Sequence, residues 1–445
     1  MVGSRTANHS ASRFSRLALC IASLALVLAA CSSPGSSQPG QAQAPAAPSP
    51  TGPKTLRLAI KEEPTTMYSG TASNEREHSD LFNASLTYFD SNGTLLPKLA
   101  VKIPSIADGD WKALPDGSME VTWKLKPNLT WHDGTPVTAE DFAFSTRILN
   151  DPANPTNPPR GMRPVTEALA PDAQTLVLRY AKPFNGAAVA GLADFPPVPR
   201  HLLEADYARL GGEGIFNHAV FTTGWVGTGP FRMTNRSVGS HIDGAAFDNY
   251  VFGRPKIDRV NIRFIPDVNS IAANLLAGEL DGVPVGSLEV AQAVALHDQW
   301  ESQGKGTVNA VPNRLRGMQL QYRDPDAPWA KDVRVRQALV QIIDRPSISE
   351  KIYYGYAPVG NVALLPSDSL FKVLEQRGAL TLWPHDPTAG GRLLDAAGWT
   401  RGADGQRRNA AGQPFTYNPG INGDSDLEEL LVVVDSVRGV GISSA

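Results

Sequence analysis

The chain has 445 residues, of which 42% are hydrophobic and 19% charged, and its formal net charge is −3. This length and composition predict a globular protein with two or more domains. Because a mildly acidic chain without basic clusters gains little from phosphate groups, we expect no nucleic-acid partner. Cys20 and Cys31 are the only cysteines. Both lie near the N-terminus, so the remaining sequence can form no disulfide, Cys-x-x-Cys zinc site or catalytic thiol.

Residues 1–30 have the pattern of a bacterial export signal. Three arginines precede the apolar run 17–28, which is shorter than a typical membrane span. The run ends in Leu-Ala-Ala before Cys31, which resembles a lipobox, where the cysteine receives a diacylglycerol. We expect residues 1–30 to be a lipoprotein signal peptide and Cys31 to be lipidated, which anchors the protein outside the cytoplasm on the bacterial cell membrane, on its periplasmic side or at the cell surface. The alternative is an ordinary secretion signal with a chance cysteine.

Residues 31–53 consist almost entirely of Ser, Pro, Gly, Gln and Ala. This composition supplies no core-forming side chain, so it predicts a disordered tether.

The body of the chain mixes strand and helix patterns. Alternation and turn residues predict strands at 55–60, 87–89, 119–125, 175–180, 229–233, 259–265 and 415–417. We expect a Pro-rich loop at 151–164 and helices at 79–86, 270–277, 333–343, 386–397 and 427–439. In the third of these helices, apolar side chains share one face and Asp332 precedes the first turn as a cap; they are Val335, Ala338, Leu339 and Ile342.

The segment 129–142, LTWHDGTPVTAEDF, predicts a turn followed by a capped helix. Asp133-Gly134 favours a tight turn. Thr138 and Asp141 have the spacing of a reciprocal helix cap. Phe142, Phe144 and Ile148 then fall on the side expected to face a core.

This segment also resembles the signature of the family 5 solute-binding proteins, which bind peptides and nickel complexes for ABC importers. Further resemblances follow in the family's order. They are Gly227-Thr228-Gly229-Pro230-Phe231, the Gly-Glu-Leu-Asp run at 278–281, the helix from Asp332 to Leu339 with Ile343-Asp344-Arg345 behind it, and the helix end Leu393 to Trp399.

The resemblance implies an α/β fold of the type II periplasmic-binding-protein class, a two-lobed clamshell with an extra subdomain in lobe one. Lobe one would comprise residues 54–95 and 216–265, with the extension at 96–215, and lobe two residues 266–445. The solute would lie between the lobes, which close by hinge motion. The partners implied are a small solute, a membrane permease and the membrane through the lipid anchor, and we expect a monomer.

The sequence patterns of common enzymes are missing. Trp131-His132-Asp133 has no second His, Cys or Glu at ligand spacing, so we interpret it as a turn and expect no metal site. No Gly-x-Ser-x-Gly motif, phosphate-binding loop or dinucleotide fingerprint occurs. We therefore expect no catalytic residue, no cofactor and no enzyme, although a glycosidase with two scattered carboxylates has no motif that would reveal it.

Family position suggests five ligand-contacting residues: Glu63, Thr65, Phe144, Thr228 and Asn269. Glu63 would face the cationic end of a peptide through a charge-assisted hydrogen bond. Several have structural alternatives. Glu63 would be a solvated loop charge, Phe144 a core residue, Thr228 a turn residue and Asn269 a helix cap.

Two features of the C-terminal region depart from the family pattern. The helix 427–439 carries the apolar stripe Leu427, Leu430, Leu431, Val434 and Val437, and Gly441-Ile442 would open a returning parallel strand just before the sequence ends. We expect a truncated or frameshifted member that binds poorly, or else a member with a shorter natural C-terminus. Gly390 and Gly391 lie inside a predicted helix, where each costs about 1 kcal/mol relative to alanine.

The sequence thus predicts a membrane-anchored lipoprotein that captures a small solute, an oligopeptide or dipeptide, for an ABC transporter. The alternatives are an interaction or sensory lipoprotein that retains the fold without transport, a non-functional fragment, and a secreted hydrolase.

Overall fold

The computed structural model describes residues 52–68, 78–91, 93–154, 164–188, 195–310, 315–366, 368–420 and 427–444. The chain forms two units, Met1–Gly52 and Pro53–Ala445, and the described residues belong almost entirely to the second. The predicted signal peptide, Cys31 and nearly all of the tether lie outside the described residues, as does most of the predicted loop at 151–164.

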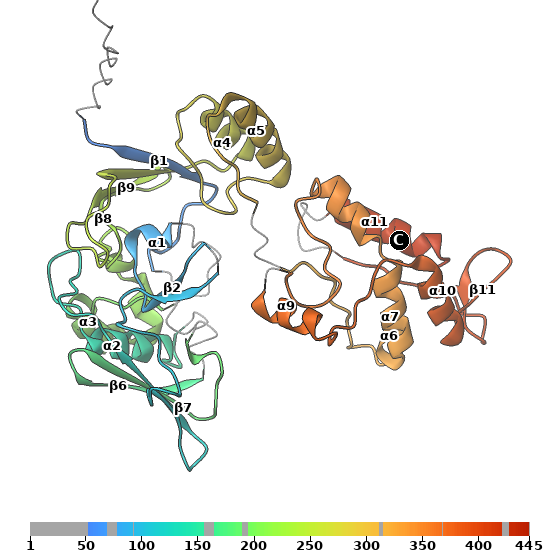
Figure 1. The fold of residues 1–445 in the computed structure, drawn as a ribbon, viewed down its shortest axis with the longest axis horizontal. Coiled ribbons are helices and arrows are strands. Elements are labelled where there is room, and N and C mark those ends of the chain that lie inside the picture. The colour runs from blue at the N-terminus through green and yellow to red at the C-terminus, as the bar shows by residue number, and fades with distance from the viewer. Residues whose placement is uncertain are drawn as a thin grey trace, which may run out of the picture. The chain divides into compact units, whose positions relative to one another are not determined.

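The first sheet has four strands in the order β1-β10-β9-β8 (Figure 1). They are β1 (Thr55–Ile60), β10 (Arg259–Phe264), β9 (His241–Ala246) and β8 (Phe231–Ser237). β1 runs parallel to β10, and the other neighbours are antiparallel. On its other side β1 meets the chain again, through a parallel bridge from Leu58 to Gly282. The strands predicted at 55–60 and 259–265 are confirmed.

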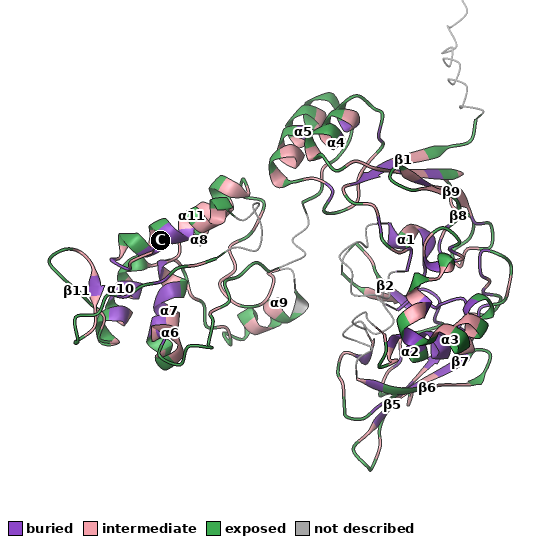
Figure 2. Ribbon diagram, turned by 180° about the vertical axis from the view of Figure 1, so that it is seen from behind, coloured by how far each residue is buried: buried purple, intermediate pink, exposed green. Residues whose placement is uncertain are grey.

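The second sheet also has four strands, in the order β4-β5-β7-β6. They are β4 (Trp111–Ala113), β5 (Met119–Lys124), β7 (Thr175–Tyr180) and β6 (Val165–Asp172). Alternate residues of β5 are buried, as the period-two pattern predicted. Helix α2 (Ala139–Leu149) packs on β6 and β7 and buries Phe142, Phe144 and Ile148 completely. In Figure 2 α2 carries buried residues, whereas β6 is mostly exposed or intermediate.

The predicted turn and cap before α2 are confirmed. Gly134 has φ of 91°, and its N–H donates to the Trp131 carbonyl at 2.9 Å. The Asp141 carboxylate accepts from the backbone N–H of Thr138 at 2.8 Å and from its hydroxyl at 3.1 Å. The Asp141 N–H in turn donates to the Thr138 carbonyl at 3.1 Å, and together these bonds fix the first turn of the helix.

Helix α1 (Ser79–Phe82) ends four residues before the predicted end at Leu86. Asn83 is extended and its side-chain amide donates to the carbonyls of Met67 and Ser79, which withdraws it from the helix. The hairpin β2 (Thr87–Phe89) and β3 (Leu95–Pro97) follows. Helix α3 (Arg200–Gly214) and two short 3₁₀ turns, Ile215–Asn217 and Ala219–Phe221, were not predicted.

Helices α4 (Val268–Leu276) and α5 (Val290–Gln303) share a small core with β1. Its buried members are Ala59, Ile271, Leu275, Leu280 and Leu296. Asp267 caps α4 by accepting from the backbone N–H groups of Asn269 and Ser270. The expectation that Asn269 itself is the cap is therefore wrong, because Asn269 is the second residue of the helix.

The C-terminal part of the described chain builds its own core around α7 and α10. Its elements are α6 (Pro328–Lys331), α7 (Val333–Ile342), α8 (Arg345–Ser347), a π-helical turn (Ile348–Ile352), α9 (Ser369–Gln376), α10 (Pro387–Ala396), β11 (Thr400–Arg401), β12 (Arg407–Arg408) and α11 (Leu427–Gly439). The predicted cap and buried face of α7 are confirmed. Asp332 accepts from the Arg334 N–H, and Val335, Ala338, Leu339 and Ile342 are buried.

The predicted buried stripe of α11 is partly wrong. Leu427 and Leu431 are 49% and 56% exposed, whereas Val433, Val434 and Val437 are buried. In place of the expected returning strand, the described residues show one isolated parallel bridge, in which Ser443 pairs with Thr416 and bonds the backbone of Phe415 and Tyr417.

Gly390 has a packing reason that the sequence did not reveal. A Cβ atom at this position would lie 2.6 Å from Ile342 Cγ1 and 3.0 Å from the Ala338 carbonyl oxygen. Glycine therefore lets α10 approach α7 closely, and this contact offsets part of its cost in helix propensity.

Candidate functional site

The loop that follows β1, residues 61–68, is the first part of the candidate site. We call it the β1 loop. Glu63 lies in it, and its carboxylate is held on both oxygens. Oε1 is 3.1 Å from Arg236 Nη2, and Oε2 accepts from the Gly239 N–H at 2.7 Å. The Pro64 carbonyl also accepts from Arg236 Nη2. One side chain of β8 therefore fixes the start of the β1 loop.

Arg236 is a buried cation, because only 5% of its side chain is exposed, against 27% for Glu63. Its Nε and Nη1 have no acceptor among the described residues. His78 is buried nearby, beside the backbone of Thr66. Burial, and secondarily the charge of Arg236, lowers the pKa of His78 to about 4, so its imidazole is neutral at pH 7. Glu63 is the carboxylate that compensates the buried guanidinium.

The second half of the β1 loop is fixed by hydrogen bonds to backbone carbonyls. The Met67 N–H and the Thr66 hydroxyl both donate to the Phe221 carbonyl, at 2.7 and 3.1 Å. The Met67 carbonyl accepts from the Asn83 amide at 3.0 Å. Tyr68 is buried and its hydroxyl reaches the Pro196 carbonyl at 3.4 Å. These contacts fix residues 66–68 of the loop against the segments around Asn83, Pro196 and Phe221.

The turn at 227–230 contacts the end of α1 and the residues that follow it. The Thr228 hydroxyl bonds both the N–H and the carbonyl of Ala84, at 3.1 and 3.2 Å. A Cβ at Gly227 would lie 2.1 Å from the Phe82 carbonyl oxygen, and one at Gly229 would lie 2.4 Å from the Phe82 carbonyl carbon. Only glycine permits this approach of two backbones.

The five predicted ligand contacts lie in different surroundings. Glu63 and Thr65 share the β1 loop, where Thr65 is exposed. Asn269 is exposed on α4, and its side-chain oxygen accepts from Gln292 at 3.0 Å.

Phe144 and Thr228 have different surroundings. Phe144 is fully buried, with its ring edge-on to Tyr207 at 5.8 Å. Thr228 is 4% exposed. Both positions favour the packing interpretation over direct contact with a solute, because a fully enclosed side chain offers a solute no surface.

Sequence reasoning missed Arg236 and His78. Arg236 lies in a strand where neighbouring residues are also polar or charged, so no pattern marks it as the buried one. His78 precedes a short helix, and its burial follows only from the tertiary packing. Among the described residues, no three His, Cys, Asp or Glu side chains gather as a metal site would require. No helix in the described part of the chain has the length and apolar character needed to cross a bilayer.

The fold is shared with solved binding proteins. NikA from Brucella suis, solved in complex with Fe(III)-EDTA, superposes with a TM-score of 0.65 at 20% identity, over 88% of this chain and 74% of that one. AppA from Bacillus subtilis, in complex with a nonapeptide, superposes with a TM-score of 0.59 at 19% identity, over 88% and 75% of the two chains. The mixed α/β fold is therefore that of the periplasmic binding proteins, as expected.

The model of the bacterial extracellular solute-binding proteins, family 5, matches residues 102–444. The chain belongs to this family. A putative ABC transporter peptide-binding protein of Brucella ovis is 25% identical over 71% of this chain, and the oligopeptide-binding protein AppA of Bacillus subtilis is 26% identical over 94% of it. The match spans 56% of the length of the Brucella ovis relative and 73% of that of AppA.

Proposed function

We propose that this protein captures a solute outside the cytoplasm for an ABC importer and that the solute is an oligopeptide or dipeptide. The family match over residues 102–444 carries the proposal. The choice of a peptide rests on relatives named for peptide binding, such as AppA of Bacillus subtilis. Capture makes and breaks no bond, so the protein acts by binding its solute and presenting it to a membrane permease.

The β1 loop forms one wall of the binding site in this proposal. A loop that is already ordered loses little conformational freedom when a ligand binds, which favours affinity. Glu63 remains the candidate for the cationic end of a peptide, now as a carboxylate fixed in place by Arg236. Thr65 and Asn269 supply exposed polar groups. Phe144 and Thr228 act through packing and through the turn at 227–230.

The location proposed is extracytoplasmic, with a diacylglycerol on Cys31 as the anchor and the protein otherwise monomeric. Two acyl chains hold a protein stably at a membrane, because each buried methylene contributes about 0.8 kcal/mol. The test is fractionation of the expressed full chain beside Cys31→Ser. The unsubstituted protein should be found in the membrane fraction with the added mass of the lipid on Cys31. The variant should show neither the added mass nor the membrane association. A variant that remains at the membrane would exclude this anchor.

Thermal unfolding with a panel of peptides of increasing length tests solute capture. A cognate peptide at 100 times its Kd should stabilise the folded protein by about 2.7 kcal/mol. Ni(L-His), the ligand in the solved structure of NikZ from Campylobacter jejuni, represents the competing class of solute. If the chelate stabilises the protein and no peptide does, the solute is a metal chelate and the peptide proposal is wrong. Peptides recovered as cleavage products would point to the hydrolase instead.

A further inference from the structure

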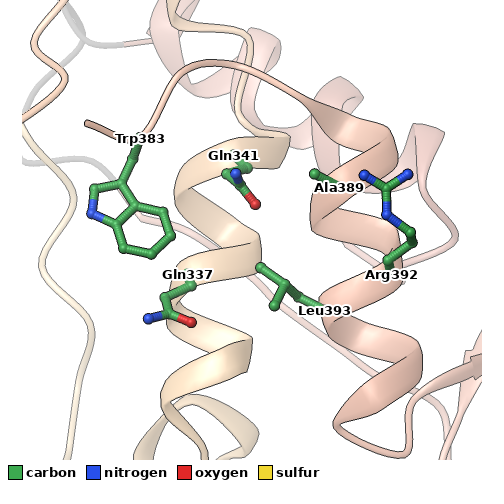
Figure 3. Close-up of a pocket in the computed structure, with 6 residues that line it drawn as sticks. All are labelled: Gln337, Gln341, Trp383, Ala389, Arg392 and Leu393. Carbon is green, nitrogen blue, oxygen red and sulfur yellow. The ribbon is translucent and has the colours of Figure 1, made fainter. Parts of the chain in front are cut away.

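A hollow with a volume of ≈ 410 Å³ lies between α7 and α10, and none of its lining residues belongs to the candidate site described above. Figure 3 shows its lining, which consists of Gln337, Gln341, Trp383, Ala389, Arg392 and Leu393. This volume falls within the range of small-molecule sites, which combine apolar walls with a few polar groups. Trp383 and Leu393 supply the apolar surface here, and two amides and a guanidinium supply the polar groups.

The wall that carries Trp383 is fixed by its backbone. Arg345 donates to the Trp383 carbonyl, and the Asp386 N–H donates to the Gln341 carbonyl at 2.9 Å. His385 Nδ1 lies 3.0 Å from the Ile343 carbonyl oxygen. The segment before α10 is thereby tied to the end of α7. The backbone at Trp383 is consequently held beside the hollow.

Two polar groups in the lining have bonding capacity to spare. The Gln341 side-chain oxygen is buried and accepts no hydrogen bond from any described residue. A buried acceptor without a donor costs about 1–3 kcal/mol. Arg392 is exposed, and no carboxylate in the described part of the chain lies within ion-pair distance of its guanidinium. A ligand that donates to Gln341 and brings an anion to Arg392 would satisfy both.

We propose that this hollow binds an N-acylated amino acid, in which a flat group, an amide N–H and a carboxylate follow one another. In Figure 3 Trp383 and Arg392 lie at opposite ends of the lining and Gln341 lies between them. The flat group stacks on Trp383, the N–H donates to the Gln341 oxygen and the carboxylate pairs with Arg392. The same chemistry occurs in a small N-aroyl amino acid and at the carboxyl end of a peptide.

Hippurate (N-benzoylglycine) is the smallest probe that carries all three groups. The full chain has eight tryptophans, so labelling with 5-fluorotryptophan gives a fluorine spectrum in which one resonance belongs to Trp383. The Trp383→Phe variant identifies that resonance by its loss. Hippurate at about 10 mM should move it. No movement, or movement only of resonances that persist in the variant, would overturn the proposal.

Variants and analogues test the polar contacts. Hippuramide, which lacks the negative charge, should bind at least about tenfold more weakly than hippurate. Hippurate should bind the Arg392→Gln variant at least about tenfold more weakly than the unsubstituted protein. The matched control is Arg377→Gln, an exposed arginine at the end of α9 outside the lining. Gln341→Met should also weaken binding by about tenfold. Equal binding of acid and amide, or equal effects of the two arginine variants, would contradict the assignment.

A peptide ending in Phe-Gly and its carboxyl-terminal amide separate the two sources of the ligand. If the free acid moves the Trp383 resonance and the amide does not, the hollow takes peptide ends. If hippurate alone moves it, the hollow takes the small compound. Both results support the proposal. Neither depends on whether Glu63 and the β1 loop bind a solute, because the signal comes from Trp383.

Discussion

His132 and Gly227 form two hydrogen bonds with each other. The His132 N–H donates to the Gly227 carbonyl at 3.0 Å, and the Gly227 N–H donates to His132 Nδ1 at 3.1 Å. His132 Nε2 lies 3.0 Å from the Gly229 carbonyl oxygen, so Nε2 carries the proton and Nδ1 accepts. Two motifs nearly a hundred residues apart are joined by this neutral imidazole, which explains why the turn after Trp131 carries a histidine.

Replacing His132 with alanine should therefore destabilise the protein. The substitution leaves the Gly227 N–H and the Gly229 carbonyl buried without partners and opens a cavity, at a cost of about 2–4 kcal/mol. Urea unfolding measures the loss. His201→Ala is the control, because His201 is partly exposed, pairs with Asp133 and has a single ring contact, with Trp131, among the described residues. Equal losses of stability in the two variants would show that the hydrogen bonds from His132 to the turn contribute little.

Stability should fall between pH 7 and pH 5. Burial lowers the pKa of His132, like that of His78, to about 4, whereas an unfolded histidine has a pKa of 6.5. Below pH 6.5 the unfolded chain therefore binds protons that the folded chain does not, and each histidine costs about 2 kcal/mol by pH 5. Urea unfolding at both pH values, with His132→Gln alongside, checks this. The variant should lose about 2 kcal/mol less, and an unchanged pH dependence would exclude His132 as a cause.

Glu63→Ala should lower both binding and stability. The buried Arg236 loses its carboxylate, which typically costs about 3–5 kcal/mol, and a displaced β1 loop should weaken solute binding about tenfold. Glu62→Ala is the matched control, since Glu62 is the exposed neighbour in the same loop. The measurements are urea unfolding and calorimetric titration. Unchanged affinity in a folded Glu63→Ala protein would remove Glu63 from the binding site.

Gly390→Ala should destabilise despite the better helix propensity of alanine. The added methyl group enters the contact with Ile342 and Ala338, and overpacking of this kind costs about 1–3 kcal/mol against a propensity gain of about 1 kcal/mol. Gly439→Ala, at the end of α11, meets no atom within 4 Å and should be neutral or slightly stabilising. Thermal unfolding measures the stability of the two variants. A stabilised Gly390→Ala protein would mean that α10 moves enough to accommodate the methyl group.

Local signals were sufficient to predict the elements whose bonding partners are close in sequence. The cap at Thr138 and Asp141 and the turn at Gly134 were predicted correctly because their hydrogen bonds span only a few residues. The face of α7 was clear because its apolar side chains recur at one helical spacing. In α11, residues 430–434 are all apolar, so periodicity could not select the buried face.

The site depends on contacts that cross long stretches of chain. Glu63 and Arg236 are 173 residues apart, and nothing in either local sequence identifies the other as its partner. The same holds for His132 and the turn at Gly227. Buried polar residues of this kind follow from the assembled fold, whereas the family resemblance suggested only which loops to inspect.

Native mass spectrometry of the protein isolated from the extracytoplasmic fraction tests the central claim most directly. If the protein captures peptides, gentle ionisation should retain a bound peptide that denaturation releases intact, and Glu63→Ala should carry less of it than Glu62→Ala. A protein that carries no small solute under conditions where its own fold is intact, or that returns only cleaved peptide, would contradict the account.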